Sequence, residues 1–160
     1  MSGSATSKSD DRNTVPRTFA SLRFTGARLE PEQVTSILQA SPTVSYRKDE
    51  PYKRSGQHVA YGRTGVWLLS SENAVKSADL NDHLGYPLSI VFPDNSEERV
   101  KQIHKLMSNG DVEADVGCFW IGHEANRRPT ISKAIKDAFR KIPAHSAKDF
   151  HTVVDGSRPC

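Results

Sequence analysis

Serine, cysteine and histidine are the side chains with which this chain could perform nucleophilic catalysis. Ser70 and Ser71 follow one apolar run, Cys118 lies in another, and six histidines are scattered along the sequence. Neither serine lies in the Gly-x-Ser-x-Gly turn that exposes the nucleophile of many hydrolases. No histidine can be paired with a nucleophile from the sequence. We therefore assign no catalytic residue and no cofactor, which favours a protein that is not an enzyme.

A second group of residues has the side-chain types that bind metals. It consists of Asp115, Cys118, His123 and Glu124, and Cys118 and His123 are close enough in sequence to chelate one ion. A structural zinc site needs about four ligands, usually in tightly spaced pairs, and here there is one close Cys–His pair. We therefore predict no metal site and interpret Cys118 as a buried strand residue.

Basic residues are concentrated towards the C-terminal end, where residues 127–148 hold seven bases and one acid. A predicted helix there carries Lys133, Lys136 and Arg140 at i, i+3 and i+7, on the face opposite its apolar residues. Such a stripe could bind a phosphate backbone, or it could be an ordinary solvated face. The aromatic residues typical of RNA-binding sheets are not evident. Nucleic-acid binding is thus the alternative function, through Arg127, Arg128, Lys133, Lys136 and Arg140.

The polar segment 48–64 and its flanks carry tyrosines and arginines, which are enriched at the hot spots of protein interfaces. An ordered loop of this length in a small domain is more often functional than idle. The aromatic residues could instead fold back as a lid on the sheet. We expect an unidentified protein partner to bind here, helped by the acidic stretch 72–115, in the manner of an immunity-type inhibitor by analogy. The expected contact residues are Tyr46, Tyr52, Arg54 and Tyr61.

Composition bounds the domain organisation of the 160-residue chain. Residues 1–16 and 155–160 are too polar to bury a core, so we expect disordered ends around a single domain at 17–154. No apolar run approaches the roughly 20 residues that a transmembrane helix needs. The first residues also lack the apolar stretch of a secretory signal, which favours a cytoplasmic protein with no membrane association.

Apolar periodicity and turn residues predict the elements that position these groups. The expected strands are 17–24, 44–46, 65–70, 112–120 and 150–154, the last as an edge strand. The expected helices are 31–39, 77–84 capped by Ser77, one between Asp94 and Asn109, and 131–142 capped by Thr130. The segment 48–64 is interpreted as a loop or an irregular hairpin, and Leu88–Phe92 as either helix or strand.

This order of elements favours an α+β fold over a doubly wound parallel sheet, because strands and helices do not strictly alternate. We predict a mostly antiparallel sheet with helices packed on one face. A ferredoxin-like split βαβ arrangement is one specific version of it.

One set of residues carries a family resemblance. Gly26, Leu29, Pro31, Val34-Thr35, Pro42-Thr43 and the later Trp67 with Ser70 stand in the order and spacing of a known pattern. In these positions the chain resembles the bacterial family catalogued as domain of unknown function 4279. It departs from the family at Gln39-Ala40, where Leu-Gly is usual, and at Asp49, where glycine often follows the lysine. The resemblance implies a fold and a bacterial origin, and it implies no activity.

Overall fold

The computed structural model describes residues 17–53, 58–93, 97–121, 129–142, 152–154 and 158–159. Residues 1–16, predicted to be a tail, lie outside the described residues. The helices are α2 (Pro31–Leu38), α3 (Leu80–Val91), α4 (Glu98–Gly110) and α5 (Lys133–Phe139). The strands are β1 (Arg17–Gly26), β2 (Val44–Tyr46), β3 (Pro51–Lys53), β4 (Val59–Tyr61), β5 (Gly65–Ser70), β6 (Glu113–Ile121), β7 (Thr152–Val154) and β8 (Arg158–Pro159).

A six-stranded sheet, in the order β2-β5-β1-β6-β7-β8, organises the molecule. Strand β1 lies at its centre and pairs antiparallel with β5 on one side and β6 on the other, while β6 and β7 run parallel. Strand β5 is inserted between β1 and β2, which are joined through α2, so this half is a split βαβ unit. The predicted α+β fold with a mostly antiparallel sheet is confirmed.

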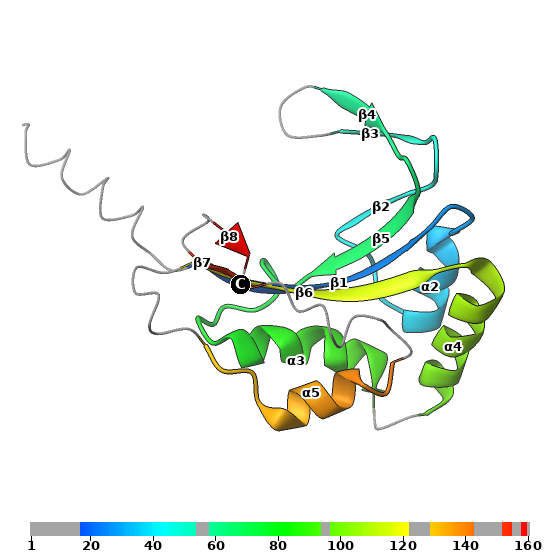
Figure 1. Cartoon of the computed structure of the whole chain (residues 1–160). Helices are drawn as coiled ribbons and strands as arrows, with labels where there is room; N and C mark the ends of the chain where they lie inside the picture. The colour runs from blue at the N-terminus through cyan, green and yellow to red at the C-terminus, as the bar shows by residue number, and fades with distance from the viewer. Residues whose placement is uncertain are drawn as a thin grey trace, which may run out of the picture.

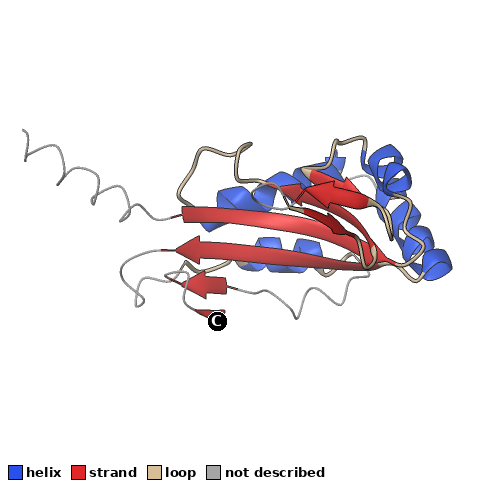
Figure 2. Cartoon of the chain, turned by 90° about the horizontal axis from the view of Figure 1, so that it is seen from above, coloured by secondary structure: helices blue, strands red, loops and turns tan. Residues whose placement is uncertain are grey.

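The four described helices lie on the same side of the sheet, as Figure 1 shows in side view and Figure 2 from above. The side chains that alternate toward them build the core. Strand β1 contributes Leu22 and Phe24, β5 contributes Trp67, and α3 contributes Leu84 and Val91, all without exposed surface. Each such burial stabilises the fold by about 1.5–3 kcal/mol before entropy is counted.

Two helices differ from their predicted bounds. Helix α3 continues to Val91 with Pro87 inside it, so Leu88–Phe92 is helical as far as Val91. The proline removes one backbone hydrogen bond, but Pro87 and Val91 are buried against the sheet and offset that loss. Helix α5 is shorter than predicted, because Ser132 rather than Thr130 is its cap and accepts a hydrogen bond from the Ile135 amide.

The cap of α3, the end of α4 and the place of β7 in the sheet also differ from the predictions. The cap of α3 is Asp79, which accepts from the Asn81 amide, and not Ser77. Helix α4 includes Asn109 and Gly110 and ends at Asp111, whose left-handed backbone (φ 51°) makes the turn. Strand β7 lies between β6 and β8 and is not an edge strand. Strand β8 lies within residues 155–160, whose predicted disorder stays a prediction because the other residues of this range lie outside the described residues.

Candidate functional site

The hairpin β3–β4 is a two-stranded sheet of its own. It leaves the main sheet at β2 and returns at β5, and in Figure 1 it rises on the side of the sheet opposite the helices. Its strands have three residues each, which fits the interpretation of 48–64 as an irregular hairpin. This segment holds the tyrosines predicted to bind a partner, so its geometry decides what they can do.

Tyr46 and Tyr52 stack on each other, with ring centroids 4.2 Å apart and ring planes 4° from parallel. Burial raises the pKa of the Tyr46 hydroxyl, and Tyr52 adds to the rise while the Arg23 cation opposes it. A side chain at Gly62 would place its Cβ 2.7 Å from the Tyr46 ring, so glycine is needed for this approach. The two tyrosines therefore contact each other at the base of the hairpin.

Backbone hydrogen bonds extend the base of the hairpin below its short strands. The Asp49 amide donates to the Gly62 carbonyl (2.7 Å) and the Gly62 amide donates to the Glu50 carbonyl (3.0 Å). Asp49 stands where the family pattern often has glycine, and its backbone is left-handed (φ 65°), a conformation that aspartate tolerates. These bonds and the tyrosine stack fix the direction in which the hairpin points.

An ion pair links the same turn to helix α2. The Arg47 guanidinium donates to the Glu32 carboxylate at 2.8 Å, and both side chains are exposed. Hydrogen bonds from the backbone and from Arg47 hold the pKa of Glu32 below its usual value. Because exposed pairs contribute little to stability, this one orients the turn more than it stabilises the fold.

One face of the hairpin exposes apolar side chains to solvent. Val59 and Tyr61 are 56% and 66% exposed, and they alternate onto the same face of β4. Lys53 and Pro51 lie directly opposite them on β3 and therefore share that face. We call Pro51, Lys53, Val59 and Tyr61 the hairpin surface. Arg54, the remaining predicted contact residue, lies outside the described residues.

Three large hydrophobic residues are exposed in the described part of the chain, and two of them belong to the hairpin surface. The three are Val44 on the edge strand β2, 45% exposed, together with Val59 and Tyr61. Single exposed apolar residues are normal in any protein, but a group of them rimmed by polar residues marks an interaction site. The sequence pointed to Tyr61 and missed Val44 and Val59, whose exposure follows from register rather than residue type.

The helix-free face of the main sheet has a hollow with a volume of about 540 Å³. Phe19 and Phe119 stack at one part of its lining (centroids 4.4 Å apart), and the Arg23 guanidinium pairs with the Asp115 carboxylate (2.6 Å) at another. Gly117 has no side chain to fill the hollow, and a Cβ there would lie 2.8 Å from Ser21 Oγ. Arg23, the cation in the described lining of this hollow, is paired with Asp115, so the hollow is poorly suited to a phosphate backbone.

A Ser–His pair does exist, formed by Ser71 and His83 on the core side. Ser71 Oγ lies 2.6 Å from His83 Nδ1 and accepts from the Ala20 amide (2.8 Å). His83 Nε2 lies 2.6 Å from the Ser77 carbonyl. Since a carbonyl only accepts, Nε2 carries the proton and Nδ1 accepts from the serine hydroxyl. Both side chains are at most 1% exposed, so no substrate reaches the hydroxyl and the pair is structural.

Cys118 lies on the core face of β6, whereas Asp115 lies on the helix-free face, so the two cannot bind one metal ion. His123 and Glu124 lie outside the described residues. Within the ranges that the structure describes, no group of three or more His, Cys, Asp or Glu residues is arranged to hold a metal. Burial raises the pKa of the Cys118 thiol to about 12.

This thiol should therefore resist modification in the native protein. In a Cys160→Ser variant, 5,5′-dithiobis(2-nitrobenzoate) at pH 8 should modify Cys118 on the order of 10³-fold more slowly in buffer than in denaturing urea, because the thiolate is the nucleophile. The same shift makes the protein less stable as pH rises above about 8.5, where the unfolded thiol ionises first. Rapid labelling of the native chain would place Cys118 outside the core.

The basic residues of the alternative site lie on the helical side. Lys133, Lys136 and Arg140 are exposed on and just after α5, and Arg140 pairs with Asp137 at 3.1 Å. Arg127 and Arg128 lie outside the described residues. The hairpin rises from the other side of the sheet (Figure 1), so these cations and the hairpin surface do not form one site.

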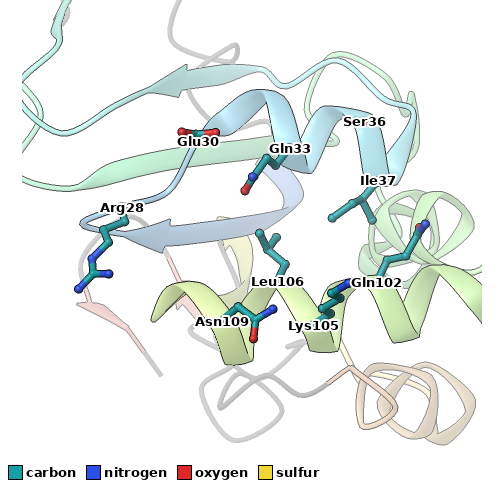
Figure 3. Close-up of a pocket in the computed structure, with 9 residues that line it drawn as sticks. All are labelled: Arg28, Glu30, Gln33, Ser36, Ile37, Gln102, Lys105, Leu106 and Asn109. Atoms are coloured by element: carbon teal, nitrogen blue, oxygen red, sulfur yellow. The ribbon is translucent and has the colours of Figure 1, made fainter.

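A second hollow, of about 550 Å³, separates helices α2 and α4. Figure 3 shows Gln33 and Ile37 of α2 facing Leu106 and Lys105 of α4 across it. Its lining mixes three amides, two cations, one carboxylate, one hydroxyl and two apolar side chains without a convergent polar group. We assign it no function.

A family model described as "Domain of unknown function (DUF4279)" matches residues 16–152, which is most of the chain. The resemblance noted in the sequence is thereby confirmed. No curated protein and no solved structure matches the chain. In the part of the chain that the structure describes, no helix has the length and apolar character to span a bilayer.

Proposed function

The chain belongs to the DUF4279 family, whose description assigns no activity. We propose that the protein is a protein-binding module that contacts its partner through the hairpin surface. The observation that carries this proposal is the exposure of Val59 and Tyr61 side by side on one face of a firmly held hairpin. Tyrosine at an exposed, rigid position is a residue type that supplies much binding energy in interfaces.

Charge around the hairpin surface indicates what the partner presents. Lys53 belongs to the surface, and Lys48 and Arg63 are exposed nearby in the sequence. Residues 45–63 hold five bases and two acids. A partner whose apolar patch is surrounded by carboxylates would complement these basic residues. The opposite charges would also speed its association. An inhibitor that covers the working site of another protein, as immunity proteins do, is one role of this kind.

Nucleic-acid binding through α5 remains the alternative, supported by the exposed Lys133 and Lys136. We rank it second because exposed lysines on a helix are ordinary solvated surface, whereas grouped exposed apolar residues call for a partner. The aromatic pair Phe19 and Phe119 lines the hollow on the helix-free face, whereas these cations lie on and beside α5 on the helical side.

The decisive variant is Val59→Ser combined with Tyr61→Ser. A partner captured by the wild-type protein from an extract of the native cell should bind this variant roughly 30-fold or more weakly, since truncating a hot spot costs about 2 kcal/mol or more. Affinity is measured by calorimetric titration with the purified partner. Tyr52 is left in place because its loss would also loosen the stack on Tyr46.

The matched control is Lys133→Gln with Lys136→Gln and Arg140→Gln, which should bind the partner as the wild type does. Unchanged partner affinity in the hairpin variant would contradict the proposal. Fluorescence anisotropy with single- and double-stranded oligonucleotides at about 50 and 200 mM salt tests the alternative. Micromolar binding that weakens with salt and is lost in the triple variant would favour nucleic acid instead.

A further inference from the structure

A groove on the helical side lies where α3, α4 and α5 meet. Its volume is about 730 Å³, within the range of small-molecule sites. Leu88 and Phe92 from the end of α3, Val100 from α4 and Ala138 from α5 provide its apolar lining. Arg99 ties the start of α4 to α3, because its guanidinium donates to the Ile90 carbonyl at 2.6 Å.

The rim of this groove is predominantly basic. Among the described residues, Lys101 and His104 on α4 and Lys141 after α5 line it, together with one carboxylate, Glu97. Lys101, His104 and Lys141 are exposed, and no ion pair is found for any of them among the described residues. An apolar trough with surplus cations at its edge complements a ligand that has an apolar body and an anionic head.

Gly85 supplies an independent observation. It lies inside helix α3, is half-buried and lines the groove, yet a Cβ added there would meet no atom within 4 Å. Glycine in a helix interior is unfavourable relative to alanine. Packing within the described chain therefore gives no reason for glycine here, whereas a ligand that lies against the α3 backbone would.

We propose that this groove binds an amphiphilic carboxylate of the fatty-acid type. The alkyl chain lies along Gly85, Leu88 and Phe92, and the carboxylate is held by Lys101 and Lys141. The site is on the opposite side of the sheet from the hairpin surface, so it is separate from the proposed protein-binding function and the two can fail independently.

The test is a calorimetric titration of the full chain with monomeric dodecanoate. Wild-type protein should bind one equivalent with a dissociation constant near or below about 100 µM, as expected for a ligand of this size. The cation dodecyltrimethylammonium should bind at least tenfold more weakly. Lys101→Gln with Lys141→Gln should weaken dodecanoate binding about tenfold or more, whereas Lys133→Gln with Lys136→Gln, on α5 but outside the groove, should not.

Gly85 variants separate binding from folding. Gly85→Ala should raise the Tm by about 2–4 °C, because alanine is the better helix former, while weakening dodecanoate binding at least fivefold. Gly85→Leu should fill the groove and abolish binding. Unchanged binding in the folded Gly85→Ala and Gly85→Leu proteins would overturn the proposal. So would equal affinity for the cationic amphiphile, or tight binding of an acidic amphipathic helical peptide without binding of dodecanoate.

Discussion

Replacing Trp67 with alanine should lower the free energy of unfolding by about 3–5 kcal/mol, the range for deleting a fully buried tryptophan. Trp67 has no exposed surface and packs edge-to-face on Phe24, with centroids 6.0 Å apart. Its indole N–H also donates to the Thr35 hydroxyl at 3.0 Å, which ties β5 to helix α2. The substitution removes the packing, the ring pair and the hydrogen bond together.

Urea unfolding followed by circular dichroism at 222 nm measures this loss without depending on the deleted fluorophore. Trp67→Phe is the control: it keeps most of the ring volume and leaves Thr35 without its donor, so a loss of about 1–2 kcal/mol is expected. Equal losses in the two variants would show that the indole hydrogen bond, and not packing, dominates at this position.

Replacing Ser71 with alanine should cost about 2–4 kcal/mol, although it removes a single oxygen atom. The Ser71 hydroxyl accepts from the Ala20 amide and donates to His83, and all three groups are buried. Its loss leaves a backbone N–H and an imidazole nitrogen without partners, and each buried unsatisfied group costs about 1–3 kcal/mol. Thermal and urea unfolding of the variant measure the effect.

The neighbouring Ser70→Ala is a matched control for the Ser71 variant. Ser70 lines the hollow on the helix-free face, and its hydroxyl accepts from the Glu72 amide at a long 3.2 Å. Water can replace that bond, so a loss below about 1 kcal/mol is expected. If the two alanine variants were equally stable, the Ser71–His83 pair would contribute nothing to the fold.

The main strands could be predicted because their side chains follow the period of a sheet. Leu22 and Phe24 alternate with polar residues in β1, and Val66–Leu69 form a continuous apolar run in β5, which is central in its half of the sheet. Binary patterns of this kind depend on neighbours in sequence. Only a few topologies are allowed for such a set of strands and helices. The ferredoxin-like order β2-β5-β1-β6 could therefore be proposed from the sequence.

The pairing of Ser71 with His83 could not be predicted, because a turn and the first residues of α3 separate them and local periodicity carries no information on their distance. The end of α3 was undecidable for a related reason. Proline at position 87 argues against a helix, and the burial of Pro87 and Val91 on the sheet outweighs it. Exposure at Val44 and Val59 depends on the register of short strands, which the sequence does not determine.

The central place of β1 has a consequence for how the protein is made. Arg23 on β1 pairs with Asp115 on β6, and 92 residues separate them. At a ribosomal rate of about 5–20 residues per second, the second flank of β1 is synthesised roughly 5–20 s after the first strand. Until then, nascent β1 has one hydrogen-bonding edge without its native partner, and such edges recruit other chains. During this interval the unpaired edge of β1 can pair with another chain. A chaperone that covers it would favour assembly, and slow translation beyond β5 would favour aggregation.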